Sequence, residues 1–375
     1  MEMATPSTGN NAALNTPLAA THLAAGARMG VWLGCALPDE FGDAAAEYRY
    51  ARETVALIDK NYRAYLSFTG PDRVRYLNAI LTNNIKDLSE GHGIVSLLLN
   101  PQGHILAEIE TYAFADRLFC VSYAMIRERL IEWLDKYIIM DDVTLTDETA
   151  RYGTLALEGP KAAALVQELS SVDVTKFEEL SSHDAAVGPI LGTSTPGRRV
   201  ACRLVKRSQG GVPGAEFIAE TGDLPELWQI LSDAARKHAG GPMGYAALSG
   251  LRLAQGVPWF GYDFGEKQIP HEAGLQDSHI SYTKGCYTGQ EILERVRSRG
   301  QVNRQRARLA FPGDVVPEAG TTLTLDGKEV GYVTRAAQTW DSDSPRILGM
   351  AYVRKEATAP GTALLWTNGT ATVMK

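Results

Sequence analysis

The sequence predicts an α+β core followed by a small antiparallel β-barrel. One observation is a β-favouring run, a Gly-Pro pair and an amphipathic helix in that order, which occurs near residues 65–81 and again near residues 154–162. A second is a series of short β-type runs after residue 299, joined at two places by Asp-Gly or Asn-Gly. A third is the length of 375 residues, which allows two or three domains at roughly 150 residues each.

The expected core covers residues 16–298, after a small, polar segment at 1–15 that has no apolar periodicity and is expected to be a disordered tail. Within the core, helices are expected where apolar residues recur every three or four positions, and strands where β-branched and aromatic residues cluster. The expected strands are 65–69, 94–99, 105–114, 118–122, 154–157 and 199–205, and the expected helices begin near residues 72, 126 and 161.

The expected barrel covers residues 299–375. Several short strands at near-regular spacing are typical of a small antiparallel barrel or sandwich. Asp326-Gly327 and Asn368-Gly369 are predicted two-residue hairpin turns, because such turns need positive φ angles that these residue types adopt readily. The expected strands are 304–311, 321–325, 330–333, 348–353 and 363–367.

The composition excludes several classes of protein. Hydrophobic residues make up 45% and charged residues 22% of the chain, which is typical of a globular protein and not of a disordered or fibrous one. With 37 basic and 44 acidic residues the net charge is −7, so no stable nucleic-acid complex is expected. We also expect neither a signal peptide nor a membrane span, because the most apolar N-terminal stretch, 18–37, is interrupted by polar residues and glycines.

The four cysteines are spread along the chain, at Cys35, Cys120, Cys202 and Cys286. They form no C-x-x-C motif, and no group of side chains has metal-ligand spacing, so we expect no metal site. A long chain with a few scattered cysteines is typical of a reduced, cytoplasmic protein rather than a disulfide-bonded one.

Three strings in the core are unusual: L-E-G-P-K-A at 157–162, P-H-E-A-G-L at 270–275 and K-G-C-Y-T-G-Q-E at 284–291. Together with Leu251-Arg252-Leu253 they resemble the YgfZ-type folate-binding proteins, which are relatives of the glycine-cleavage T-protein, an aminomethyltransferase. The resemblance extends over nearly the whole chain. K-G-C-Y-T-G-Q-E is the string that indicates the YgfZ branch.

This resemblance implies both a fold and a function. The implied fold is an aminomethyltransferase-like core of intertwined subdomains around a central cavity, which binds tetrahydrofolate or a one-carbon-substituted folate. The implied function is that of a factor that supports the assembly or repair of iron–sulfur enzymes, including enzymes that modify tRNA. Two alternatives stay open: a folate-dependent aminomethyltransferase or methyltransferase, and a binding module in which folate is only structural. The sequence therefore leaves open whether the protein is an enzyme.

The chain departs from the T-protein at two acidic positions. The family's G-G-I-x-D-D string reads Gly103-His104-Ile105-Leu106-Ala107-Glu108 here, and its L-R-L-E string ends in Ala254. We therefore expect methylene transfer by the T-protein route to be impaired, while the folate pocket persists. Glu108 is a candidate replacement for the missing acid, and plain solvent exposure of this strand position is the alternative.

The resemblance also implies folate-binding residues. Glu216 in Gly214-Ala215-Glu216-Phe217 matches the family glutamate that binds the pterin ring, where a carboxylate accepts two parallel hydrogen bonds. Its alternative is a strand glutamate that faces solvent. Arg252 is expected to hold the folate or its carboxylates in a bidentate fork, and its alternative is an ion pair with a neighbouring acid. Tyr287 and Arg297 are further candidate folate-binding residues. His271 and His279 are expected near the pocket, and the alternative for each is a hydrogen-bonded structural histidine.

Two rows of alternating arginines follow the last string: Arg295, Arg297 and Arg299, then Arg304, Arg306 and Arg308. In the second row apolar residues alternate with the arginines, as in a strand with one buried and one basic face. We expect these rows to bind the polyglutamyl tail of a folate. RNA is a second candidate ligand, and ion pairs with acids across the domain junction are the structural alternative.

Cys286 is the predicted catalytic thiol, and Lys284 is its neighbouring cation. Thr288 and Glu291 read as a capping box for a helix that starts at Gly289, which places the thiol near the positive end of the helix dipole. Because Lys284 adds a positive charge two residues upstream, we expect the pKa of the thiol to lie below its reference of about 8.5. The alternative is a small residue packed at a strand-to-helix junction.

Overall fold

The computed structural model describes residues 13–189, 198–300, 302–341 and 345–375. Residues 1–12 of the expected disordered tail lie outside the described residues. Leu14–Asn15, which also belong to that expected tail, instead form a short strand, β1, that pairs in parallel with β3 (Cys35–Glu40).

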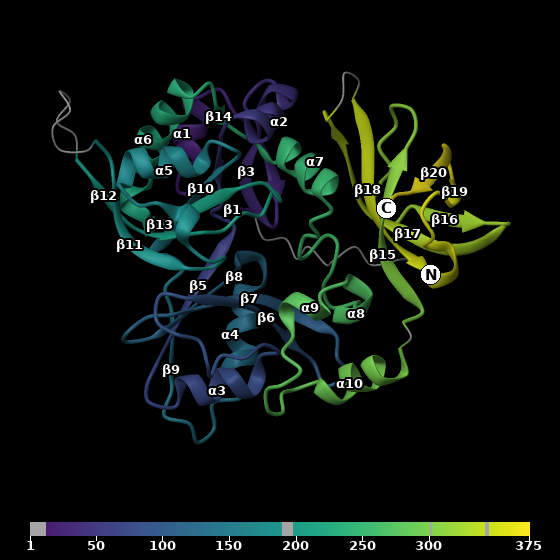
Figure 1. Cartoon of the computed structure of the whole chain (residues 1–375), viewed down its shortest axis with the longest axis horizontal. Coiled ribbons are helices and arrows are strands. Elements are labelled where there is room, and N and C mark those ends of the chain that lie inside the picture. Colours follow the sequence, from purple (N-terminus) through teal and green to yellow (C-terminus); the bar gives the residue numbers. More distant parts are fainter. Residues whose placement is uncertain (1–12, 190–197, 301, 342–344) are drawn as a thin grey trace.

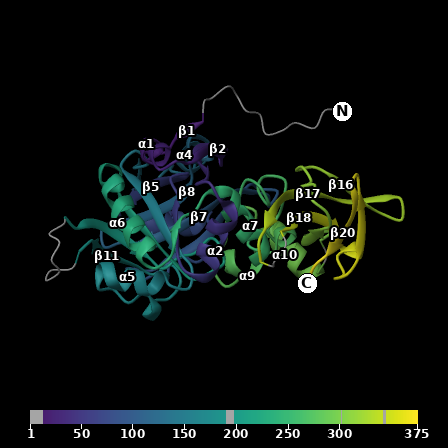
Figure 2. The same ribbon diagram turned by 90° about the horizontal axis from the view of Figure 1, so that it is seen from above.

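The core and the barrel lie side by side, with helix α7 (Tyr245–Gln255) between them in both views (Figure 1 and Figure 2). The core contains two large β-sheets, and the last six strands close into a barrel. The prediction of an α+β core followed by an antiparallel barrel is therefore confirmed. None of the helices in the described part of the chain is long and apolar enough to cross a membrane.

The lower sheet in Figure 1 has five antiparallel strands in the order β6-β7-β8-β5-β9. Four of these strands, β5 to β8, have bounds within two residues of those predicted from the sequence, and β9 was not predicted. The elements of this half are β5 (Arg63–Thr69), α3 (Arg73–Ile80), β6 (Gly93–Leu99), β7 (Ile105–Ala113), β8 (Leu118–Tyr123), α4 (Arg127–Asp135) and β9 (Thr144–Asp147).

The upper sheet has six strands in the order β11-β12-β13-β10-β4-β14, and apolar side chains of α5 and α6 pack on it. Sequence patterns had indicated only β10, α5 and β12 of this half. Its elements are β4 (Ala56–Asp59), β10 (Tyr152–Glu158), α5 (Ala162–Ser170), β11 (Ser182–Val187), β12 (Val200–Val205), β13 (Gly214–Glu220), α6 (Leu224–Lys237) and β14 (Gly241–Pro242).

The repeated strand, Gly-Pro, helix unit occurs once in each large sheet, as β5–α3 and as β10–α5. Both glycines have positive φ, 95° at Gly70 and 138° at Gly159. A β-carbon at Gly70 would lie 2.2 Å from the carbonyl oxygen of Asp142, and one at Gly159 would lie 2.6 Å from that of Thr54. Glycine is thus required at both turns by backbone conformation and by space.

A third, three-stranded sheet and several helices complete the core. These elements are α1 (Ala19–Ala24), β2 (Arg28–Trp32), α2 (Ala44–Glu53), α8 (Pro270–Ala273), α9 (Gln276–His279) and α10 (Gln290–Arg299).

The C-terminal barrel is closed in the order β15-β18-β17-β16-β19-β20, and all its pairings are antiparallel. The five predicted strands are present, β17 being much longer than expected, and β20 was not predicted. The strands are β15 (Arg304–Phe311), β16 (Thr322–Leu325), β17 (Lys328–Thr339), β18 (Arg346–Arg354), β19 (Ala363–Trp366) and β20 (Gly369–Val373).

The two predicted hairpin turns differ in outcome. Asp326 and Gly327 join β16 to β17 with φ angles of 51° and 74°, as a turn with two left-handed residues requires. In the other hairpin Trp366 pairs with Gly369, so the turn residues are Thr367 and Asn368, one position earlier than predicted.

An ion pair between Arg335 of β17 and Asp263 of the core joins the two parts. A register shift between Val333 and Arg335 marks a bulge in β17, and bulges re-aim side chains. Arg335 Nη2 lies 2.7 Å from Asp263 Oδ2, and Nη1 donates to the Ser249 hydroxyl at 2.9 Å. Both charged groups are buried. At Gly250 a β-carbon would lie 2.3 Å from the carbonyl oxygen of Gln338, so a glycine lets the barrel approach α7 closely.

The second arginine row also serves this junction, which differs from its expected role as a free basic face. Arg306 Nε donates to the carbonyl oxygen of Ala273 at 2.8 Å, and Arg308 Nη1 donates to that of Ala254 at 3.1 Å. Arg304 lies 3.8 Å from Glu272. The observed arrangement is thus closer to the structural alternative, in which these arginines bind across the domain junction. Their principal acceptors, however, are main-chain carbonyls and not acids.

Replacing Asp263 with alanine should destabilise the protein by about 3–5 kcal/mol, because the buried Arg335 guanidinium would lose its counter-ion. Urea unfolding measures this loss. The matched control is Asp233→Asn, which removes an exposed ion pair with Arg236 and should cost less than about 1 kcal/mol. Equal losses in the two variants would contradict a structural role for the buried pair.

Candidate functional site

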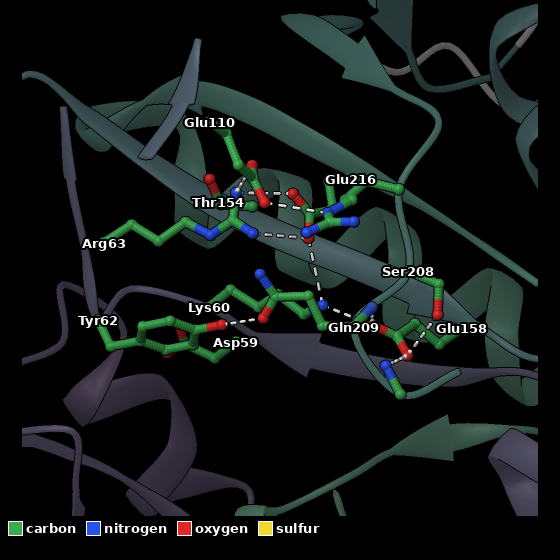
Figure 3. Close-up of polar contacts among 12 residues, drawn as sticks. Asp59, Lys60, Tyr62, Arg63, Glu110, Thr154, Glu158, Ser208, Gln209 and Glu216 are labelled. Atoms are coloured by element: carbon green, nitrogen blue, oxygen red, sulfur yellow. Dashed lines mark hydrogen bonds and ion pairs between the residues drawn. The ribbon is translucent and has the colours of Figure 1, made fainter. Parts of the chain in front are cut away.

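The segment from Lys60 to Arg63 crosses from the upper sheet to the lower sheet, because β4 ends at Asp59 and β5 begins at Arg63. The side chains of Lys60 and Arg63 point toward the same group of carboxylates (Figure 3). Neighbouring strands of the upper sheet supply Glu158 at the end of β10 and Glu216 in β13. All four side chains are buried.

These four residues form a continuous set of ion pairs. Lys60 Nζ donates to Glu158 Oε1 at 2.5 Å and to Glu216 Oε1 at 3.2 Å. Arg63 Nη2 donates to Glu216 Oε1 at 2.9 Å, and Arg63 Nη1 lies 2.7 Å from Oε2, an ion pair without hydrogen-bond alignment. Both oxygens of Glu216 thus face cations. Glu216 is not a solvent-facing strand residue, so that alternative is wrong, while its predicted pterin role stays a prediction.

Glu110 extends the set of ion pairs toward β12. Arg207 Nε donates to Glu110 Oε1 at 3.0 Å, the Tyr112 hydroxyl donates to Oε2 at 2.9 Å, and Arg63 Nη1 lies 3.5 Å from Oε2. Burial opposes ionisation of this carboxyl group, but the two guanidinium charges outweigh it and lower the pKa of Glu110 from 4.5 to about 2.

The loop Ser208–Gln209–Gly210 is tied to Glu158. Glu158 accepts hydrogen bonds from the main-chain N–H groups of Gln209 at 3.1 Å and Gly210 at 2.7 Å, and from the Ser208 hydroxyl at 3.1 Å. A β-carbon at Gly210 would lie 2.4 Å from Glu158 Oε2, so glycine is needed there. Burial raises the pKa of Glu158, and the Lys60 charge and these donors more than reverse that effect.

Arg252 holds the same loop from the other side. Its Nη1 donates to the carbonyl oxygen of Gln209 at 2.6 Å, and its Nη2 donates to that of Pro258. The guanidinium lies 4.6 Å from the ring centroid of Trp259, and burial lowers its pKa. The predicted alternative, an ion pair with an acid, is not what these contacts show, and the predicted role toward folate stays a prediction.

A small cavity of about 10 Å³ lies beside the ion pairs, which is room for about one water molecule. Glu108 lines it and is held by the Tyr123 hydroxyl at 2.7 Å and by His279 Nε2 at 3.0 Å. The Glu108 side chain is 15% exposed, so the expectation of plain solvent exposure is wrong. Burial opposes its ionisation, and His279 and Tyr123 outweigh this and lower the pKa of Glu108. The other lining residues are Tyr62, Arg63, Glu110, Val121, Ser122, Tyr123 and Gln209.

Ala107 lies on the opposite face of β7 from Glu108, as strand geometry requires. Its side chain is fully buried in the large apolar cluster of the core. An acid at this position would enter that apolar cluster and would not reach the cavity. The replacement of an acid by Ala107 therefore removes no carboxylate from the cavity, contrary to what the sequence suggested.

The side chains that line this cavity suit the polar groups of tetrahydrofolate, but the cavity is too small to hold its ring. The lining offers a carboxylate, a guanidinium, an amide and phenol groups, which suit the polar edge of a heterocycle. The cavity admits about one water molecule, and Glu216 is already engaged by Lys60 and Arg63. A pterin would enter only if the segments that line the cavity moved apart.

The K-G-C-Y-T-G-Q-E segment lies outside this cavity, since neither Lys284, Cys286 nor Tyr287 lines it. Lys284 Nζ donates to three main-chain carbonyls at and beyond the end of α3, those of Asn78, Leu81 at 2.5 Å and Asn83 at 3.0 Å. Burial lowers the pKa of Lys284 to about 8. Tyr287 is buried, and its ring lies 5.1 Å from Lys284 Nζ.

The helix after Cys286 begins one residue later than predicted. Helix α10 starts at Gln290, and Gly289 occupies the N-cap with a φ of 82° and without a side-chain cap. The predicted capping box of Thr288 and Glu291 is therefore wrong. A β-carbon at Gly289 would lie 2.7 Å from the carbonyl oxygen of Asn100, so close packing against the β6–β7 turn selects glycine. Cys286 itself is exposed.

Arg297 lies at a second, larger cavity of about 310 Å³. Its guanidinium lies 4.2 Å from the ring centroid of Tyr282, and Nη1 lies 3.7 Å from Glu294. His271 joins this second cavity and bonds to the Tyr282 hydroxyl at 3.0 Å, whereas His279 contacts Glu108 at the first. Arg295 pairs with Glu291 at 2.8 Å. The Arg299 side chain is outside what the structure describes.

Sequence reasoning missed Lys60, Arg63 and Glu158. A usable signal was present, because Lys60 lies two residues after the apolar run 55–58 and Glu158 directly follows the apolar run 155–157. Charged residues at the ends of buried strands are almost never fully buried unless they are paired. Across the described ranges no group of three or more His, Cys, Asp or Glu side chains is arranged to hold a metal ion.

Comparisons with known proteins agree on the family. Residues 18–279 match the family model described as the GCVT N-terminal domain. An aminomethyltransferase from Streptomyces avermitilis is 26% identical over 94% of this chain and 93% of its own length. One from Herpetosiphon aurantiacus is 29% identical over 85% of this chain and 84% of its own length.

A solved structure shows the same fold. The glycine cleavage system aminomethyltransferase T from Bartonella henselae superposes with a TM-score of 0.83 at 22% identity, over 97% of both chains. The order of core and barrel is thus the same along the whole chain.

Stability should fall in acid as Glu110 takes up a proton. The unfolded chain protonates this group near pH 4.5 and the folded protein near pH 2, so its contribution is complete above pH 4.5 and is lost as the pH falls toward 2. The contribution at neutral pH should be roughly 3–4 kcal/mol.

Urea unfolding of the wild type and of Glu110→Gln between pH 7 and pH 3 measures this. The variant should be less stable at pH 7 and should lose less stability in acid. Glu53→Gln, at an exposed position, is the control and should follow the wild type. Parallel pH profiles for Glu110→Gln and the wild type would refute the assignment.

Proposed function

Because the chain belongs to the GCVT family, we propose that it binds a reduced folate and supports the assembly or repair of iron–sulfur enzymes, including tRNA-modifying ones. The observation that carries this proposal is the exposed thiol of Cys286 in the K-G-C-Y-T-G-Q-E loop. The resemblance of the chain to the YgfZ-type proteins rests on the K-G-C-Y-T-G-Q-E string of this loop.

Cys286 differs in its surroundings from the other three cysteines. Cys35, Cys120 and Cys202 are buried, and burial raises the pKa of each to about 12. The thiolate is the nucleophile and the metal ligand, so these three are inert near neutral pH. An exposed thiol, by contrast, is accessible to a client protein or to a soft metal ion.

Lys284 supports the proposal as a positioning residue. All three hydrogen bonds of its ammonium go to main-chain carbonyls near the end of α3. These bonds attach the loop to the core two residues before Cys286. We therefore propose that Lys284 holds the thiol loop in place, instead of the catalytic role predicted from the sequence.

Glu108 is the residue that we propose to face the folate. It is an ionised carboxylate at the cavity wall, oriented by Tyr123 and His279. A reduced folate, when bound, supplies a carrier for one-carbon units. The residues of this chain would bind and orient its polar edge, and Tyr287 and Arg297 would contact it only if it extended beyond the cavity that Glu108 lines.

An aminomethyltransferase is the second candidate function. It is favoured by the position of Ala107, which leaves the carboxylate of Glu108 in the cavity, and by the names of the relatives from Streptomyces and Herpetosiphon. The two candidates differ in whether the protein turns over an aminomethyl donor.

Titration calorimetry with tetrahydrofolate, followed by an assay with an aminomethyl donor, separates these functions. We expect saturable binding without transfer of the aminomethyl carbon. Transfer at a catalytic rate would establish the second candidate instead. Absence of heat with tetrahydrofolate and with its one-carbon derivatives would contradict both.

Alkylation of the native protein should label Cys286 first, and the other three cysteines should react only on unfolding. Cys286→Ser should then fail to restore the activity of iron–sulfur enzymes in cells that lack the protein. Ser298→Ala, at an exposed position of α10, is the control and should restore it. Full restoration by the serine variant would rule out a function of this thiol.

A further inference from the structure

The second cavity lies where the core meets the barrel, and it shares no lining residue with the cavity beside Glu108. Helix α8 contacts both α10 and the barrel strand β15 in this region (Figure 1). The volume of the second cavity, about 310 Å³, lies at the lower end of the range of small-molecule sites, which is about 300–1,000 Å³. Its polar lining residues are His271, Gln276, Asp277, Tyr282, Arg297 and Gln305.

Arg297 brings to this cavity a cation whose donors are not engaged. Its guanidinium lies 3.7 Å from Glu294 and donates a hydrogen bond to none of the described residues. By contrast, Arg295, Arg306 and Arg308 donate to an acid or to main-chain carbonyls. Of these four arginines, only Arg297 lines the second cavity. The planar fork of a guanidinium suits a carboxylate.

Asp277 brings the opposite charge to the same cavity. Its side chain is exposed, and its one hydrogen bond among the described residues comes from the Gln276 amide at 3.1 Å. Burial raises the pKa of Tyr282, while Arg297 opposes this shift and Asp277 adds to it. The two charges that line the cavity therefore lie near one ring.

Two buried polar atoms of the lining residues have no hydrogen-bond partner among the described residues. They are Nδ1 of His271 and Oε1 of Gln276. Burial lowers the pKa of His271, although Asp277 and Glu294 oppose this, so its ring is uncharged at neutral pH. Because buried polar atoms are almost always hydrogen-bonded, these two atoms favour a site that takes a polar ligand.

We infer that the second cavity binds a free amino acid with an aliphatic side chain. One cation and one carboxylate in the lining match a ligand with one charge of each sign, so the ligand carboxylate contacts Arg297 and its ammonium group contacts Asp277. Val296 and Val302 line the same cavity and suit an aliphatic side chain. Asp277 would repel a polyanion, such as the polyglutamyl tail expected from the sequence. This ligand is separate from folate and does not depend on the proposed function.

Titration calorimetry with three ligands of one carbon skeleton tests the inference. Leucine carries both charges, 4-methylpentanoate lacks the ammonium group, and 3-methylbutylamine lacks the carboxylate. Leucine should bind saturably with a Kd of about 1 mM or lower. Each analogue should bind at least about five-fold more weakly, because it loses one charge-assisted contact at a partly exposed site. Absence of saturable binding by leucine, or equal binding by either analogue, would overturn the inference.

Two variants assign the contacts. Arg297→Gln should bind leucine no more tightly than 3-methylbutylamine, and Asp277→Asn should bind it no more tightly than 4-methylpentanoate. The control is Arg295→Gln, on the same helix, whose arginine pairs with Glu291 and does not line the cavity. It should bind leucine as the wild type does. Unchanged discrimination in the first two variants, or an equal loss in the control, would refute these contacts.

A competition experiment separates this cavity from folate binding. Saturating tetrahydrofolate should leave the Kd for leucine unchanged, since the two cavities share no lining residue. Displacement of leucine by tetrahydrofolate would place the folate in the second cavity and overturn the assignment of a separate ligand. If the protein binds leucine but no tetrahydrofolate, the proposed function fails and this inference stands.

Discussion

The buried ion pairs between Lys60, Arg63, Glu158 and Glu216 are the interaction on which the rest of the core depends. They form where the chain passes from β4 in one sheet to β5 in the other, so they hold the two sheets in a fixed relation. Their geometry also fixes the loop at 208–210, because Glu158 binds two of its N–H groups. Arg63 and Gln209, which these contacts hold, also line the small cavity beside Glu108.

The cavity and the exposed thiol are connected through a short stretch of chain. His279 contacts Glu108, and its carbonyl oxygen accepts a hydrogen bond from Thr82 at 2.6 Å. Five residues later Lys284 is fixed to the carbonyls that follow α3. The segment that leads from His279 to the thiol loop is therefore attached to the core at both points.

More of the fold than of the candidate site could be predicted from the sequence. Local patterns predicted the Gly-Pro turns, most strands of the lower sheet and the barrel, because those features depend on residues close together in the chain. Patterns did not predict β4, β13 or α6, whose positions are set by distant partners. The same reason explains why the site was only partly predicted. Glu108 and Glu216 were identified from motifs, but Lys60 and Arg63, which form ion pairs with Glu216, lie about 150 residues before it in the chain. The alternating arginines at 304–308 predicted a basic face that binds an anion. That prediction was misleading, because Arg306 and Arg308 donate to main-chain carbonyls of the core.

A crystal structure of the protein with tetrahydrofolate tests the central claim most directly. The ion pairs predict that the carboxylate of Glu216 stays with Lys60 and Arg63, and the lining of the cavity predicts that the ligand meets Glu108. A structure in which Glu216 binds the pterin edge, with Lys60 or Arg63 turned away from it, would contradict the claim.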